Sequence, residues 1–254
     1  MLNFQDLPDE VVLKILSFSE TKDLITCGQV SKRIRKISRD GTLWVTANLE
    51  KKIVKTELLG MILQKGCRIL NLCQSTIHGS LSLNKKSELR VLNLSQPHCT
   101  INADCEYCEC RENTEILEEI LFSCCFLQHL VIEDVFLSPK MASSICHNGN
   151  TLQILNLKGS YLDEPNLQEI IRCCQNLKEV DLAYEYKKYG NEYFDFLAKN
   201  MPPNVKKLNL GNNLITDDEV QILLSRCKKI KAVNPQGTRI IANNFSNPIF
   251  IPNN

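Results

Sequence analysis

The residues with the clearest capacity for chemistry are cysteines gathered between residues 96 and 114. Cys105 and Cys108 have the Cys-x-x-Cys spacing, at which two thiolates can share one tetrahedral zinc ion. No second Cys-x-x-Cys or histidine pair follows, so the motif is incomplete. We interpret the segment as a reduced surface loop and expect no cofactor. The alternative is a zinc site, with His98 nearby and with the ligand set Cys99, Cys105, Cys108 and Cys110.

Motifs of catalytic sites are missing from the rest of the sequence. There is no Gly-x-Ser-x-Gly, no phosphate-binding glycine loop, no His-Glu-x-x-His and no compact pair of acids. The histidines at positions 78, 98, 129 and 147 are scattered along the chain. The sequence therefore predicts a protein that is not an enzyme.

Composition limits the kinds of partner and the compartment. The net charge is +1 with acids and bases interspersed, which gives no electrostatic reason to expect nucleic acid or a membrane as the partner. No apolar run approaches the roughly 18 residues that a membrane span requires. The 13 cysteines are odd in number and the first residues lack signal-peptide features. We therefore expect an intracellular protein with reduced thiols, in the cytoplasm and/or the nucleus.

The elements that position these residues follow from a repeated phrase. An apolar residue is followed, three residues later, by two apolar residues separated by one polar residue. Most copies are roughly 22 to 28 residues apart, within the range of leucine-rich repeats. Each copy predicts a short strand with its leucines turned inward, stacked in parallel on the next. The copies begin at Cys67, Leu89, Leu127, Leu152, Leu177, Val205 and, in degraded form, Ile230.

Between the strands the apolar period changes to that of a helix. Thr216 and Glu219 predict a capping box, and we expect Asn166 and Glu169 to act in the same way. Three residues before the strand phrase, Cys124, Cys174 and Cys227 predict tightly packed helix-to-strand corners. This strand-helix unit resembles the cysteine-containing class of leucine-rich repeats. The resemblance implies an α/β fold, a curved solenoid with parallel strands inside and helices outside.

Residues 1–46 do not fit the repeat. The sequence Asp6-Leu7-Pro8-Asp9-Glu10 predicts a helix start, and a second and a third helix are expected before Trp44. Three helices in about 40 residues bury too little surface to be very stable alone. Trp44, which is the only tryptophan, is therefore either the core of this module or a contact with a larger partner.

The order Leu-Pro-Asp-Glu, Ile-Leu-Ser-Phe, Asp-Leu, Val-Ser-Lys-Arg and Leu-Trp over residues 6–44 resembles the F-box. That resemblance implies docking onto a Skp-type adaptor, which bridges to a cullin and a RING-box protein. The alternative is a small helical cap for the solenoid. The residues that would be shared between the module's core and the adaptor interface are Leu7, Pro8, Glu10, Ile15, Leu16, Leu24, Val30, Leu43 and Trp44.

The predicted domain organisation is an F-box at 1–46, a linker helix at 47–66, about seven leucine-rich repeats at 67–237 with the cysteine-rich insertion at 96–114, and a C-terminal tail at 238–254. The tail either packs back on the last repeat or is a disordered end. Together the modules resemble the F-box/leucine-rich-repeat family and are similar to its S-phase kinase-associated branch. The resemblance implies the substrate-recognition subunit of an SCF-type cullin-RING ubiquitin ligase, which marks a client for proteasomal degradation. The alternative is a repeat scaffold or inhibitor without a ligase.

A client protein would be expected on the concave side, where the side chains that flank the buried leucines point. These side chains could recognise a charged or hydrogen-bonding segment, such as a phosphorylated one. Asn and Asp also recur at this position in repeats that bind nothing there, so a purely structural role is the alternative. The candidate client-binding residues are Asn93, His129, Glu133, Asn156, Lys158, Glu179, Asp181 and Asn209.

Overall fold

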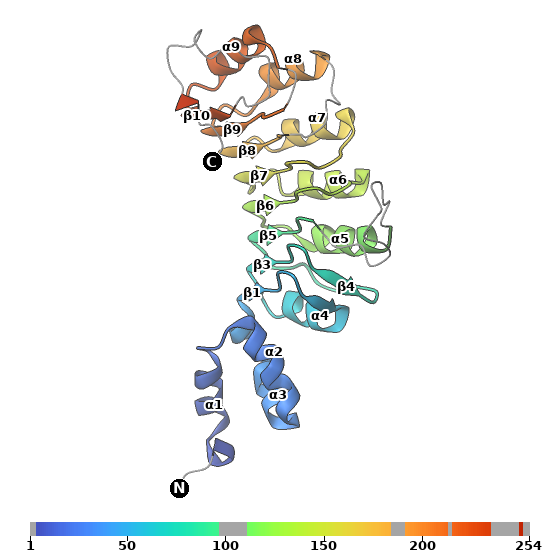
Figure 1. Cartoon of the computed structure of the whole chain (residues 1–254), viewed down its shortest axis with the longest axis vertical. Helices are drawn as coiled ribbons and strands as arrows, with labels where there is room; N and C mark the ends of the chain where they lie inside the picture. Colours follow the sequence, from blue (N-terminus) through green and yellow to red (C-terminus); the bar gives the residue numbers. More distant parts are fainter. Residues whose placement is uncertain (1–3, 97–110, 184–190, 213–214, 235–248, 251–254) are drawn as a thin grey trace.

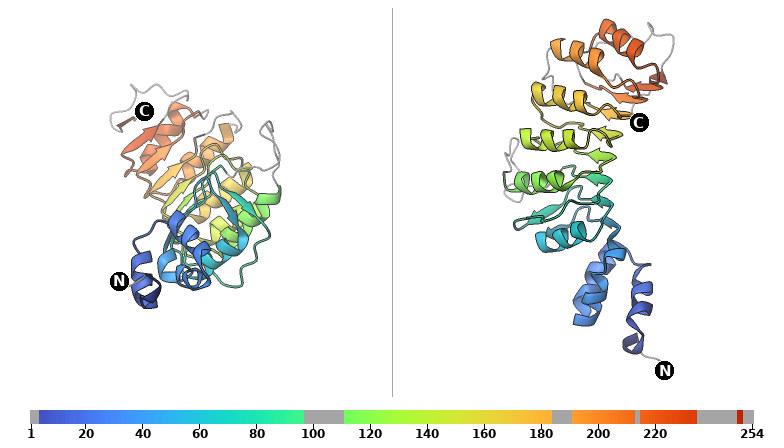
Figure 2. Two further views of the ribbon diagram at one scale, coloured as in Figure 1. Left: turned by 60° about the horizontal axis from the view of Figure 1, so that its bottom comes forward. Right: turned by 180° about the vertical axis from the view of Figure 1, so that it is seen from behind.

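The computed structural model describes residues 4–96, 111–183, 191–212, 215–234 and 249–250. Within these residues the molecule is an elongated stack with strands along one side and helices along the other (Figure 1). The N-terminal helices project from one end of the stack, as the view from behind also shows (Figure 2, right). The expected α/β solenoid behind a helical N-terminal module is therefore confirmed.

The N-terminal module contains η1 (Phe4–Asp6), α1 (Asp9–Leu16), α2 (Thr21–Val30), α3 (Lys32–Ser38) and η2 (Gly41–Trp44). The predicted start of the first helix at Asp6 was too early, because residues 4–6 form a separate 3₁₀ turn and Pro8 takes the N-cap position. Proline suits a helix entrance because its φ is already fixed near the helical value. At the third helix, the Ser31 hydroxyl accepts a hydrogen bond from the Ile34 amide at 3.1 Å, which caps the helix.

The predicted strands are confirmed and form one parallel sheet. Its order is β1 (Thr46–Asn48), β3 (Ile69–Asn71), β5 (Val91–Asn93), β6 (His129–Val131), β7 (Ile154–Asn156), β8 (Glu179–Asp181), β9 (Lys207–Asn209), β10 (Ala232–Asn234) and β11 (Ile249–Phe250). The central apolar residue of each strand from β3 to β9 is in register with the next, and all are buried. They make a continuous column: Leu70, Leu92, Leu130, Leu155, Val180 and Leu208.

The stack begins earlier than the sequence indicated. The interval predicted as a linker helix, 47–66, does contain α4 (Thr56–Gln64), but β1 and β2 (Ile53–Lys55) precede that helix. The repeat phrase occurs here as Ala47 and Leu49, both buried, and the small alanine hides it from a search for leucines. β2 pairs with β4 (Thr76–His78) in a second, two-stranded parallel sheet. The first repeat therefore follows the N-terminal module with no separate linker.

The remaining helices are α5 (Arg111–Ser123), α6 (Pro139–His147), α7 (Glu164–Cys173), α8 (Asn191–Asn200) and α9 (Asp217–Arg226), stacked along one side of the sheet (Figure 1). The predicted capping box of Thr216 and Glu219 is confirmed at α9. The expected cap at Asn166 was wrong. Asp163 caps α7 instead, because its carboxylate accepts the Asn166 amide at 2.9 Å.

The turn that leaves each strand has a recurrent backbone conformation. Three residues past β1, β3, β5, β6, β7 and β9, the chain adopts a positive φ of 49° to 67°. Gly159 occupies this position in the turn after β7. A β-carbon there would collide with the carboxylate of Asp134 from the preceding repeat. This left-handed residue lets the chain leave the sheet toward the helices without losing the strand register. The positions are Lys51, Gln74, Gln96, Asp134, Gly159 and Asn212.

The helix-to-strand corners contain the buried cysteines that the sequence predicted. The Cys124 thiol donates to the carbonyl of Ile120 at 3.2 Å, and the Cys227 thiol donates to that of Pro202 at 3.4 Å. Burial raises the pKa of Cys124 and Cys227 to about 11 and that of Cys174 to about 12. These thiols therefore stay protonated at neutral pH and act as small apolar fillers.

Two further observations concern the tail and membrane segments. Of the predicted tail, β11 pairs in parallel with β10, so this part returns to the last repeat; the other tail residues lie outside the described ones. Among the described helices, none has the length and apolar character to cross a membrane.

Candidate docking surfaces

The predicted adaptor-binding residues divide into buried and exposed groups. Leu16, Leu24 and Trp44 are buried in the module's own core, while Leu7 and Leu43 are half-buried. The Trp44 side chain is only 2% exposed, and its indole N–H donates to the carbonyl oxygen of Ser38 at 2.7 Å. Of the two roles predicted for this tryptophan, the structure therefore shows the core role.

The exposed group defines an apolar face on the first helix. Ile15 on α1 is 43% exposed, and Val30, the last residue of α2, is 75% exposed. The sequence prediction missed Val11 and Phe18, which are 42% and 79% exposed. Val11 and Ile15 are four residues apart and share one face of α1. Phe18 follows in the turn after the helix, where its amide donates to the Ile15 carbonyl at 3.2 Å. We call Val11, Ile15 and Phe18 the α1 face.

The neighbouring side of α1 holds the helix to its module. Val12 and Leu16 are buried there, so α1 has one buried and one exposed set of apolar residues. Their spacing was visible in the sequence, but a helix with a single buried stripe explained it equally well. Pro8 and Glu10, also predicted as adaptor contacts, are exposed near the start of the same helix.

An arginine links the start of α1 to α3. The Arg33 guanidinium pairs with the Asp9 carboxylate at 2.7 Å and also donates to the carbonyl oxygen of Leu7. An exposed ion pair is worth at most about 1 kcal/mol, but the forked contact fixes the direction of the helix. The α1 face is therefore presented in a defined orientation.

Comparison with known proteins identifies this module. The F-box-like family model matches residues 4–50, which span all the helices just described. The chain is thus similar to F-box/leucine-rich-repeat proteins. It is 25% identical over 193 residues to an F-box/FBD/LRR-repeat protein of Arabidopsis thaliana, covering 71% of this chain. The aligned part is 44% of that relative, so the match spans less than half of the relative's length. Similarity to the S-phase kinase-associated branch stays a prediction.

On the sheet side, the parallel register brings the predicted client residues into two rows. Asn93, Asn156, Asp181 and Asn209 stand at matching strand ends, and His129 and Glu179 at matching strand starts. Glu133 and Lys158 stand two residues beyond the ends of β6 and β7. Six of the eight residues therefore lie on strands and two lie just after them, whereas their role in binding a client stays a prediction.

The side chains at the strand ends also stabilise the turns that follow the strands. The Asn93 side-chain oxygen accepts the Ser95 amide at 2.9 Å, and Asn156 accepts the Lys158 amide at the same distance. Asp181 and Asn209 repeat this contact two residues ahead, and the Asn209 amide also donates to Asp181 at 2.9 Å. Such local bonds favour turns, which explains why Asn and Asp recur here. The structural alternative accounts for this row without a client.

The charged candidates are in part engaged by neighbouring repeats. Glu133 accepts a hydrogen bond from the Asn156 side chain at 2.6 Å. Glu179 pairs with Lys207 at 2.9 Å, with the lysine side chain 64% exposed. Exposed pairs of this kind contribute little to stability, so a client could exchange its own groups for them at low cost.

A polar groove lies at the edge of the repeats where the chain enters the strands, and sequence reasoning missed it. Its volume is about 450 Å³ and it spans successive repeats. Its lining contains three lysines and no carboxylate. Lys178 reaches Gln153 at 2.7 Å and Lys229 reaches Asn204 at 2.6 Å, so both bond neutral amides. The residues that line this basic groove are Gln128, Asn150, Thr151, Gln153, Asn176, Lys178, Asn204, Lys206 and Lys229.

Two lysines of the groove occupy a recurrent position of the repeat. Lys178 and Lys206 follow the first apolar residue of their phrases directly, at the position that Gln153 occupies in the preceding repeat. The predicted client-binding residues stand between or after the buried leucines, so this earlier position was not among them. A column of like charges becomes visible only when the repeats are aligned on their strands.

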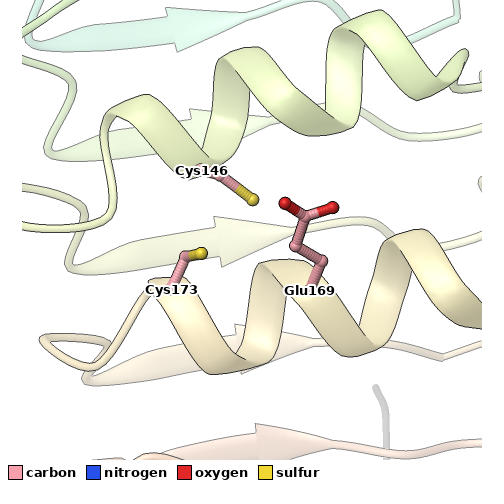
Figure 3. Close-up of side chains that lie close together, drawn as sticks. All are labelled: Cys146, Glu169 and Cys173. Atoms are coloured by element: carbon pink, nitrogen blue, oxygen red, sulfur yellow. The ribbon is translucent and has the colours of Figure 1, made fainter.

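For metal binding, the predicted zinc ligands Cys99, Cys105, Cys108 and Cys110 lie outside the described residues. Among the described residues, a different group could hold a metal ion: Cys146 on α6 with Glu169 and Cys173 on α7 (Figure 3). No sequence motif marks this group, because its members come from two helices.

Proposed function

We propose that this chain is the substrate-recognition subunit of an SCF-type cullin-RING ubiquitin ligase. The F-box module binds a Skp-type adaptor, which connects it to a cullin and a RING-box protein. The repeats bind a client protein, which is then ubiquitinated and degraded. The chain itself performs no catalysis and works in the cytoplasm and/or the nucleus.

The observation that carries the proposal is the α1 face. Val11 and Ile15 on α1 and Phe18 just after it are exposed apolar residues within the part that matches the F-box-like model. Exposing them to water is unfavourable at about 25 cal/mol for each Å² of apolar surface. A second protein that covers the α1 face recovers this free energy on binding. Apolar and aromatic anchors of this kind dominate the energetics of protein interfaces.

The test uses the exposed residues and avoids the buried ones. An Ile15→Asp/Phe18→Asp variant places two carboxylates on the α1 face without touching the buried Val12 and Leu16. If each side chain is worth about 2 kcal/mol, the dissociation constant for a purified Skp-type adaptor rises about 1000-fold. Calorimetry or surface plasmon resonance measures this change. Phe126→Asp, at a 52% exposed aromatic in the repeats, is the matched control and leaves adaptor binding unchanged.

Two results would overturn the proposal. One is adaptor binding by the double variant with wild-type affinity. The other is the absence of binding by the wild-type chain together with the absence of cullin in its complexes. The second result favours the alternative, a repeat scaffold or inhibitor that acts without a ligase.

For the client, the sheet side and the basic groove are the surfaces that support binding. The groove offers Lys178, Lys206 and Lys229 without a carboxylate in its lining. An acidic or phosphorylated segment is therefore the kind of client that fits. A Lys178→Glu/Lys206→Glu variant retains adaptor binding and no longer promotes turnover of a client that depends on Ile15 and Phe18. Unchanged turnover of every such client would place the client site elsewhere.

A further inference from the structure

Cys146, Glu169 and Cys173 form a compact group on the helical side of the repeats. Their two sulfur atoms and a carboxylate oxygen lie within 4.8 Å of one another. Glu169 and Cys173 are four residues apart on α7, so they share one face of that helix. Cys146 stands next to the last residue of α6, the neighbouring helix, and all three side chains point into the space between the helices (Figure 3).

The packing role that explains the corner cysteines does not explain these two. Each corner cysteine stands three residues before its strand phrase and is buried. Cys146 stands six residues before Leu152 and is half-buried, while Cys173 stands four residues before Leu177 and is exposed. Cysteine is among the residues most often buried, so an exposed thiol opposite a second thiol calls for a different explanation.

The electrostatics of the group lack a positive charge. Burial raises the pKa of Cys146. The pKa is raised further by nearby groups that are negative when ionised, namely Cys173, Cys174 and Glu169. Among the residues that the structure describes, Glu169 takes part in no ion pair. The nearby Arg172 guanidinium instead lies over the Phe196 ring, 4.9 Å from its centre. A bound cation would offset the repulsion among the three donors.

The distances suit a small thiophilic cation. Zinc binds thiolate sulfur at about 2.3 Å and carboxylate oxygen at about 2.0 to 2.2 Å, which places the ligand atoms of one tetrahedron about 3.5 to 3.8 Å apart. Without an ion, the three ligand atoms already lie within 4.8 Å of one another. Small rotations of the three side chains close the difference without moving a helix.

We propose that Cys146, Glu169 and Cys173 bind one Zn²⁺ between α6 and α7, with the fourth position open to water or to a donor from another molecule. On binding, each thiol releases its proton to solvent and ligates the ion as a thiolate. Because the ligands come from adjacent helices, the ion connects two successive repeats. Neither the F-box docking proposed above nor a client is required for this site.

The test is a titration of the full chain with Co²⁺, a spectroscopic substitute for Zn²⁺, in a reductant without thiols. The parent protein carries Cys99→Ser, Cys105→Ser, Cys108→Ser and Cys110→Ser, so that the cysteine-rich insertion cannot contribute. We expect one Co²⁺ per chain with sulfur-to-cobalt charge-transfer bands, bleached by Zn²⁺. Adding Cys146→Ser/Cys173→Ser abolishes these bands, and adding Glu169→Gln weakens binding at least about tenfold.

The matched control is Cys73→Ser/Cys125→Ser, which removes two half-buried cysteines outside the group and leaves the titration unchanged. Equal Co²⁺ binding by the parent and by Cys146→Ser/Cys173→Ser overturns the proposal. If that variant does not fold, Cys173→Ser alone and Glu169→Gln give the same decision, because both side chains are exposed. A parent that binds no Co²⁺ after reduction, and that forms a Cys146–Cys173 disulfide in air, also overturns the proposal.

Discussion

Trp44 provides the sharpest test of how the F-box module is held together. If it is a core residue, its removal destabilises the module before it affects any partner. Trp44→Ala deletes a large side chain that is 2% exposed, which costs about 3 to 5 kcal/mol. A module of about 40 residues has little stability to lose, since whole domains have only about 5 to 15 kcal/mol. We expect Trp44→Ala to unfold the F-box while the repeats stay folded.

Trp44→Phe separates the hydrogen bond from the packing. Phenylalanine keeps an aromatic ring but has no N–H to donate to the Ser38 carbonyl, 2.7 Å from the indole nitrogen. Ser38 is buried, so its carbonyl loses its partner away from water, at about 1 to 3 kcal/mol. The lost ring volume adds to this. The expected order of stability is therefore wild type, then Trp44→Phe, then Trp44→Ala.

The assay is urea unfolding monitored by circular dichroism, with amide hydrogen exchange over residues 32–44 as the local measure. Because Trp44 is the only tryptophan, its fluorescence in the wild type reports on the module alone. Phe126→Ala, at an exposed aromatic, is the control and changes stability by less than about 0.5 kcal/mol. If Trp44→Ala leaves stability and exchange unchanged but abolishes adaptor binding, Trp44 is a direct contact and the core assignment is refuted.

Three further predictions concern the repeats. Gly159→Ala destabilises the chain by about 1 to 2 kcal/mol because φ is +67° there, whereas Gly60→Ala within α4 is neutral or stabilising by up to about 1 kcal/mol; thermal unfolding compares the pair. Asn148→Leu lowers the free energy of unfolding in urea by about 2 to 6 kcal/mol, because the buried Leu127 amide and Cys124 carbonyl lose their hydrogen-bond partner. Asn150→Leu, at an exposed position, is the control and is neutral. Burial raises the pKa of Cys67 from 9.0 to about 12, so its contribution to stability is present below pH 9 and is lost as the pH rises toward 12. Unfolding free energies of wild type and Cys67→Ala should therefore converge over that interval, and a constant difference would contradict the assigned shift.

The sequence was most informative where one residue type has one physical role. Leucines at fixed spacing have to be buried together, so the strands from Leu70 to Leu208 and their register could be derived from the repeat alone. The corner cysteines could be predicted for the same reason, because a small apolar side chain recurs wherever a helix meets a strand. The capping box at Thr216 depends only on neighbours three residues away, and it was also correct.

The failures occurred where several roles share one residue type. The first repeat was hidden because Ala47 stands where later repeats have leucine or valine. On α1, Leu16 is a core residue and Ile15 is exposed, yet both are aliphatic and adjacent, and only the packing of α3 against the helix separates them. The group of Cys146, Glu169 and Cys173 could not be found by spacing within one segment, because it depends on how two helices lie together.

The structure of α1 also connects stability with partner choice. Val12, Leu16 and the contacts of Arg33 hold the helix, while the α1 face stays exposed beside them. A partner that covers this face binds the folded module and not the unfolded one, so it stabilises the module by mass action, by about 2.7 kcal/mol at a concentration 100 times its dissociation constant. We therefore expect residues 9–16 to exchange their amide hydrogens faster in the isolated chain than in a complex with a Skp-type adaptor. Ile15→Asp/Phe18→Asp should remove that protection while exchange in the repeats stays the same. Equal exchange with and without the adaptor in the wild type would show that the α1 face is not where the adaptor binds.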